Sequence, residues 1–146
     1  MSNRVPRVDE RIAVAVPTKN RPQYLAAALA ALLQQTYPYW MLVVNDQGDL
    51  PVADHDVIQD LLTLIRQEHE VVLFRGKTGW DRHQRAMEAV PLGIEWILRI
   101  DDDVLPSAAF LEKILRPWSL LPEKNFAAAG GCYPEPKYHP LDLDLQ

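Results

Sequence analysis

The sequence has little cysteine, no run of basic residues and no long apolar stretch. Cys132 is the only cysteine, which excludes an internal disulfide and a thiolate zinc cage and suits a reducing compartment. The chain carries 15 Lys and Arg against 20 Asp and Glu, so its net charge is −5, and we expect no nucleic-acid partner. The longest apolar stretch, residues 24–33, is about half of what spans a bilayer.

The first residues, 1–11, are polar and charged, and no apolar stretch of the signal-peptide type follows them. Together with the single cysteine, this start predicts a cytoplasmic protein. Homodimerisation and peripheral membrane association stay open, because uncovered apolar surface and unpaired sheet edges tend to find partners.

The length of 146 residues, 48% of them hydrophobic, fits one domain with a core of its own. Proline exceeds its usual frequency, with 12 in the chain, and it separates the apolar segments. We expect one domain over residues 1–131 and a proline-rich tail over residues 132–146.

Apolar runs of strand length alternate with segments of helical period. The predicted strands are residues 12–16, 40–44, 71–74, 95–100 and 126–129. Helices are predicted after Pro22, after Asp54 or Asp56, around Trp80 to Val90, and after Ser107. This alternation predicts an α/β fold with an open, mostly parallel sheet and helices on both faces, a three-layer α/β/α architecture. Ligands are then expected at the carboxyl ends of the strands.

Three consecutive carboxylates, Asp101, Asp102 and Asp103, follow the fourth predicted strand. Like charges beside an apolar strand need compensation, and a hard divalent cation, Mg²⁺ or Mn²⁺, supplies it through oxygen ligands. Asp101 and Asp103 point to the same side if the strand geometry persists, while Asp102 faces away or toward a ribose. The alternative is a solvated turn before the next helix.

Two further groups sit where a nucleotide is expected. Asp46 follows the second strand, where it can form an Asx turn or accept a hydrogen bond from a nucleobase imide or a ribose hydroxyl. Arg82 and Arg85 lie three apart on one predicted helix and could approach a diphosphate together, although solvent exposure is the alternative for either.

In this order, the segments resemble glycosyltransferase family 2. Residues 14–46, VAVPTKNRPQYLAAALAALLQQTYPYWMLVVND, are similar to the nucleotide-binding start of that family, and residues 97–106, ILRIDDDVLP, are similar to its metal-binding Asp-x-Asp motif. The resemblance covers residues 12–131 and implies the Rossmann-like GT-A fold and transfer of a sugar from a nucleotide-diphosphate donor.

The resemblance also implies site residues. Donor binding is carried over to Pro17, Thr18, Lys19, Asn20, Asp46, Arg85 and Asp102, and binding of Mn²⁺ or Mg²⁺ to Asp101 and Asp103. This sequence departs from the family pattern at three positions: Asn45 replaces the first acid of a paired acidic turn, Lys19 stands where an aromatic residue is common, and Ala86 follows Arg85 in place of Asn.

The mechanism that the resemblance implies is inverting transfer from a UDP-sugar to an acceptor hydroxyl on a glycan, lipid or protein. Family members take the general base from an acceptor-binding half beyond the fifth strand, which residues 132–146 do not resemble, so no catalytic residue is assigned. We therefore expect the donor-binding part of a longer enzyme, a truncated product or a partial sequence, in which the isolated chain binds donor but transfers little.

Two alternatives remain from the residues. A phosphohydrolase of the haloacid dehalogenase type also places Asp-x-Asp after a strand, but Leu105 stands where that family has Thr or Val, and the motif follows the fourth strand instead of the first. The second alternative is a noncatalytic module that binds a nucleotide sugar or a protein through the same strand ends. Slow hydrolysis of the donor would favour the enzyme.

Overall fold

The structure is a computed structural model that describes residues 11–76, 90–91, 94 and 96–119. Several predictions fall outside the described residues: the helix around Trp80, the fifth strand at residues 126–129, and the tail. Arg82, Arg85 and Cys132 lie outside them as well.

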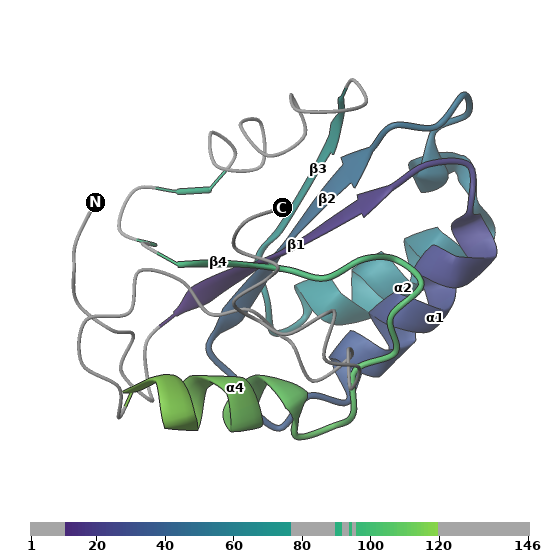
Figure 1. The fold of residues 1–146 in the computed structure, drawn as a ribbon. Helices are drawn as coiled ribbons and strands as arrows, with labels where there is room; N and C mark the ends of the chain where they lie inside the picture. Colours follow the sequence, from purple (N-terminus) through teal and green to yellow (C-terminus); the bar gives the residue numbers. More distant parts are fainter. Residues whose placement is uncertain (1–10, 77–89, 92–93, 95, 120–146) are drawn as a thin grey trace, which may run out of the picture.

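The described strands form one parallel sheet of the predicted class. They are β1 (Ile12–Thr18), β2 (Trp40–Asp46), β3 (Val71–Arg75) and β4 (Ile97–Arg99). The order across the sheet is β3-β2-β1-β4 (Figure 1). β1 is therefore central, and its carboxyl end adjoins the ends of β2 and β4.

α1 (Pro22–Leu33) connects β1 to β2, and the short 3-10 helix η1 (Val52–Asp54) and α2 (Asp56–Arg66) lie between β2 and β3. α4 (Phe110–Ser119) follows β4. Figure 1 shows α1 and α2 side by side on one face of the sheet, with α4 near β4. In the described part of the chain, no helix has the length and apolarity that crossing a membrane requires.

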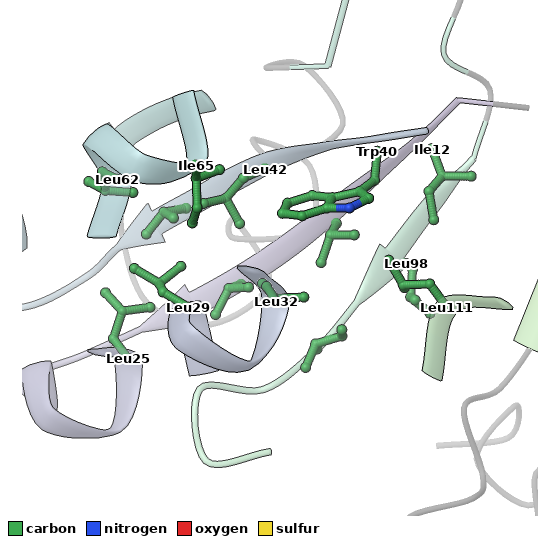
Figure 2. Close-up of a cluster of buried hydrophobic side chains, with 14 of the residues drawn as sticks. Ile12, Leu25, Leu29, Leu32, Trp40, Leu42, Leu62, Ile65, Leu98 and Leu111 are labelled. Atoms are coloured by element: carbon green, nitrogen blue, oxygen red, sulfur yellow. The ribbon is translucent and has the colours of Figure 1, made fainter. Parts of the chain in front are cut away.

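The core lies mainly between the sheet and these helices. Alternation along β1 places Ile12, Val14 and Val16 in this core, while Ala13 and Ala15 face the other side. Figure 2 shows how leucines and isoleucines of the helices meet the strands around the indole of Trp40. Burying each such side chain stabilises the fold by roughly 1.5–3 kcal/mol. This packing fixes the strands whose ends carry the polar residues.

The Gln-Thr turn after α1 holds the start of α4. Gln35 accepts a hydrogen bond from the backbone N–H of Leu111 (3.1 Å) and donates one to the carbonyl of Ser107 (2.7 Å). Thr36 donates to the carboxylate of Glu112 (3.0 Å). The side-chain cap seen at α4 thus comes from Gln35, a distant residue, where the sequence predicts Ser107.

Candidate functional site

Three connections meet at the carboxyl edge of the sheet, namely those that follow β1, β2 and β4. Thr18, the last residue of β1, is paired with Asp46 of β2. On its other side β1 pairs with β4 up to Ala15 and Arg99, after which the chain enters the acidic turn of residues 101–103. The topology therefore brings residues from three distant parts of the sequence to one edge.

Asp102 is the buried residue of this acidic turn, with 1% of its surface exposed. Its carboxylate accepts a hydrogen bond from the hydroxyl of Thr18 (2.8 Å) and forms an ion pair with Arg21. Both partners precede the first turn of α1, so Asp102 ties the loop after β1 to the turn after β4. The ribose contact expected for Asp102 would compete with these bonds.

Asp101 and Asp103 keep accessible carboxylates. β4 ends at Arg99, so the strand geometry assumed for this pair does not persist, and Val104 closes a turn by donating to the carbonyl of Asp101 (3.1 Å). The side chain of Asp101 is 44% exposed and accepts a hydrogen bond from Arg99 (2.9 Å). The side chain of Asp103 is 54% exposed and lies 3.8 Å from Arg21.

These two carboxylates fit the chemistry of a hard divalent ion. Mg²⁺ and Mn²⁺ prefer oxygen ligands, and Mg²⁺ is usually held by one or two carboxylates together with substrate phosphates and water. Within the described ranges no group of three or more His, Cys, Asp or Glu is arranged to hold a metal. Such an ion would therefore complete its coordination with water and with oxygens of its substrate, in addition to Asp101 and Asp103.

Asp46 is enclosed by protein donors. It is 2% exposed and accepts hydrogen bonds from the backbone N–H groups of Gly48 (3.0 Å) and Val52 (2.9 Å). Arg75 adds an ion pair (2.9 Å) and donates a second bond to the carbonyl of Gly48 (2.6 Å). Of the two interpretations from the sequence, the bond from the Gly48 N–H is the contact that defines an Asx turn. A nucleobase bound to Asp46 would share a carboxylate that already accepts these bonds.

Asn45 stands where the family pattern has its first acid, and it is 2% exposed. In the described structure, neither its amide nitrogen nor its amide oxygen has a hydrogen-bond partner. Glycine at position 76 leaves room for this amide, because a Cβ there would lie 2.3 Å from the Asn45 amide oxygen. A carboxylate at position 45 would add a second buried negative charge next to Asp46, so the neutral amide lowers the charge of this edge.

The loop after β1 exposes Lys19, and Pro17, within β1 itself, is half-buried, while Asn20 has a structural role. Asn20 adopts a left-handed backbone (φ 54°), which asparagine tolerates well. Its amide donates to the Asp49 carboxylate (3.1 Å) and accepts from the Asp49 N–H (2.8 Å). A pocket of about 390 Å³ opens beside the Asn20–Asp49 contact, and none of the three acids after β4 lines it. It is lined by Asn20, Pro22, Asp49, Leu50, Pro51, Val52, Asp54 and His55.

Two cations hold the buried carboxylates, and neither was predicted as a site residue: Arg21 and Arg75. Their positions in the sequence could have indicated this role. Arg75 is the last residue of β3, and Arg21 lies in the loop between β1 and α1, so both are at the carboxyl edge of the sheet. A buried carboxylate at such an edge needs a cation nearby, and an arginine in a strand-end loop is suited to supply it.

Known proteins resemble this chain in sequence family and in fold. The family model described as Glycosyl transferase family 2 matches residues 13–135. The mannosyltransferase PcManGT from Pyrobaculum calidifontis, solved in complex with GDP-Man and Mn²⁺, has a TM-score of 0.63 and 20% identity, covering 82% of this chain and 36% of that one. TarS from S. aureus, solved in complex with UDP-GlcNAc, has a TM-score of 0.56 and 21% identity, covering 70% of this chain and 29% of that one. No curated protein matches the chain.

The sheet order and these structural likenesses define the fold as the GT-A α/β fold of glycosyltransferases. The family match then covers most of the sequence, and the chain belongs to glycosyl transferase family 2. It spans about a third of the length of these two solved chains, the TarS chain being residues 1–349 of that protein. The predicted fold class is confirmed, and the family match sets aside the phosphohydrolase alternative.

Proposed function

We propose that this chain binds a nucleotide-diphosphate sugar, with a UDP-sugar as the first candidate, and serves a metal-dependent, inverting glycosyl transfer. The observation that carries the proposal is the acidic turn after β4, where exposed Asp101 and Asp103 flank the buried Asp102 beside the loop after β1. UDP-GlcNAc in TarS and GDP-Man with Mn²⁺ in PcManGT are ligands of proteins with the same fold, which supports this class of donor.

In this proposal Asp101 and Asp103 hold Mg²⁺ or Mn²⁺ near the donor diphosphate. Such an ion, when bound, stabilises the negative charge of a departing nucleoside diphosphate as a Lewis acid. The exposed surfaces of Pro17 and Lys19 lie toward the nucleotide, and Arg85 remains a proposed diphosphate contact. Thr18, Asn20, Asp46 and Asp102 shape this site through bonds within the protein.

The reaction needs an acceptor hydroxyl, from a glycan, a lipid or a protein, to attack the anomeric carbon from the side opposite the leaving group. The new C–O bond forms as the bond to the diphosphate breaks, which inverts the anomeric centre, and the hydroxyl proton passes to a general base. Asp46 and Asp102 are buried and held by protein donors, so neither suits this role. No catalytic base is assigned among the described residues.

Calorimetric titration tests the donor site. UDP, UDP-glucose and GDP-mannose are titrated into the wild-type chain with and without Mn²⁺, and into two variants. Asp103→Ala removes an expected metal ligand, and Asp60→Ala removes the same charge from an exposed position of α2. We expect Mn²⁺-dependent binding in the wild type and in Asp60→Ala, and its loss in Asp103→Ala. A folded wild type that binds none of the three would contradict the proposal.

A noncatalytic nucleotide-sugar-binding module is the second candidate, because the buried acids of the described site cannot act as the base. It would give the same titrations. The two candidates separate when donor is incubated with the chain and Mn²⁺ and release of free sugar is followed. In an enzyme site the donor is slowly hydrolysed, so free sugar is released faster than without protein. With a pure binding module, the donor is hydrolysed only at its background rate.

A further inference from the structure

Arg21 lies between the two loops of the candidate donor site and reaches two carboxylates at once. Its guanidinium forms an ion pair with Asp102, whose side chain is fully buried, and another of its nitrogens lies 3.8 Å from exposed Asp103. The side chain of Arg21 is itself 45% exposed. One side of the guanidinium is therefore anchored in the protein while the remainder lies at the surface of the acidic turn.

The position of this charge is fixed. A guanidinium is planar, permanently charged and carries five N–H donors, so one carboxylate cannot use all of them. Asp102 holds one end, and the ring of Tyr24 lies under the group, 5.5 Å from its central carbon. Because these contacts hold Arg21 in place, its remaining N–H donors have a defined position at the edge of the site.

Arg21 contributes a large part of the positive charge at the acidic turn. Three carboxylates, Asp101 to Asp103, face two guanidiniums, those of Arg21 and Arg99, which leaves a single net negative charge. Arg75, another arginine in the described part of this edge, is bound at the end of β3 to Asp46 and to the carbonyl of Gly48. Removing Arg21 would double the net negative charge where the metal is expected.

We infer that Arg21 is a built-in counter-cation of the donor site: it competes with the divalent ion for Asp103 and attracts the diphosphate of the nucleotide. This inference rests on the proposed donor function. A divalent ion at Asp103 would lie within a few ångströms of the guanidinium and be repelled by it, whereas a diphosphate there is attracted. Arg21 thus opposes metal binding before the nucleotide arrives and favours the nucleotide.

The test measures the two ligands separately in Arg21→Gln. Binding of Mn²⁺ alone is followed by the electron paramagnetic resonance signal of the free ion, and binding of UDP alone by calorimetry in the presence of EDTA. We expect Mn²⁺ to bind roughly three- to tenfold more tightly than to wild type and UDP to bind more weakly by a similar factor, with both differences shrinking as salt is raised.

Two variants control for charge and position. Arg21→Lys keeps the positive charge and should stay near wild type for both ligands. Arg11→Gln loses the same charge at the opposite end of β1, where Arg11 pairs with Glu70 (2.9 Å), and should change neither affinity. If Arg21→Gln does not fold because Asp102 is left unpaired, the double variant Arg21→Gln, Asp102→Asn removes the guanidinium without leaving a buried charge. For that variant UDP is expected to bind more weakly, because the guanidinium donors near Asp103 are lost, whereas the loss of the Asp102 charge offsets the loss of repulsion for Mn²⁺.

Opposite changes for Mn²⁺ and UDP in Arg21→Gln support the inference. Weaker binding of both ligands, or no change in either, means that Arg21 only shapes the loop, and overturns it while the donor function stands. A folded wild-type chain that binds no UDP even when Mn²⁺ is present contradicts the proposed function itself, and the inference fails with it.

Discussion

The acidic turn after β2 and the acidic turn after β4 use the same residue type in different ways. In the first, Asp46 is enclosed by two backbone N–H groups and Arg75. In the second, only Asp102 is buried, and Asp101 and Asp103 remain accessible on either side of it. Depth within the edge decides the role: the buried carboxylates build the turns, and the exposed ones remain available to a ligand.

Both turns depend on an arginine from elsewhere in the chain. Arg75 reaches Asp46 across 29 positions of sequence, and Arg21 reaches Asp102 across 81. Each arginine side chain is about half exposed, 46% and 45%, while its partner is buried. Removing one member of such a pair leaves a buried charge or buried N–H donors without a partner. This lowers the free energy of unfolding more than removing both members together.

The largest expected effect comes from the turn after β2. Asp46→Ala should lower the free energy of unfolding by about 2–4 kcal/mol, because two buried N–H groups lose their acceptor and Arg75 loses its counter-charge. Urea denaturation measures this, with exposed Asp60→Ala as the matched control. A loss no larger than that of the control would mean that the carboxylate does not hold the turn together.

An intermediate effect is expected from the contact between β1 and the turn after β4. Thr18→Val removes the hydroxyl that donates to Asp102 and nearly keeps the shape, so we expect a loss of about 1 kcal/mol. Thr63→Val on α2 removes an exposed hydroxyl that bonds the carbonyl of Gln59 and serves as control. Equal urea midpoints for the two variants would show that the Thr18 bond does not stabilise the fold.

The smallest effect on stability is expected at the exposed carboxylate. Asp103→Asn should change the free energy of unfolding by less than about 0.5 kcal/mol, since its pair with Arg21 is long and solvated. The same preparation should lose Mn²⁺-dependent binding of UDP in calorimetry. A stability loss as large as that of Asp46→Ala would make Asp103 a structural residue and remove the difference between the two turns.

Apolar periodicity predicted most of the described fold. It located the strands and the helix starting at Pro22, because continuous apolar runs and a leucine stripe are local features. It placed the end of β1 too early, since Pro17 and Thr18 stay in the sheet by pairing with Asn45 and Asp46. Backbone pairing with a neighbouring strand is a tertiary property that hydrophobicity does not show.

The candidate site was harder to predict than the fold. The acids themselves were found, but whether Asp46 and Asp102 face a ligand or the protein depends on which of 15 basic residues the topology brings to them. The side-by-side placement of Asp101 and Asp103 was inferred from strand alternation, which ends at Arg99. Local sequence predicts a residue type at a strand end, whereas its partners come from distant segments.

The central position of β1 also has a consequence for the order of assembly. β1, α1, β2, α2 and β3 follow one another along the chain and can associate through short loops, whereas β4 must join β1 from much farther along. Its ladder with β1 spans three residue pairs, and the Thr18–Asp102 bond beside it closes a separation of 84 residues. Closing so long a loop costs chain entropy before any contact offsets it. On this ground we expect the seam between β1 and β4, beside the proposed donor site, to be the last part of the described sheet to form.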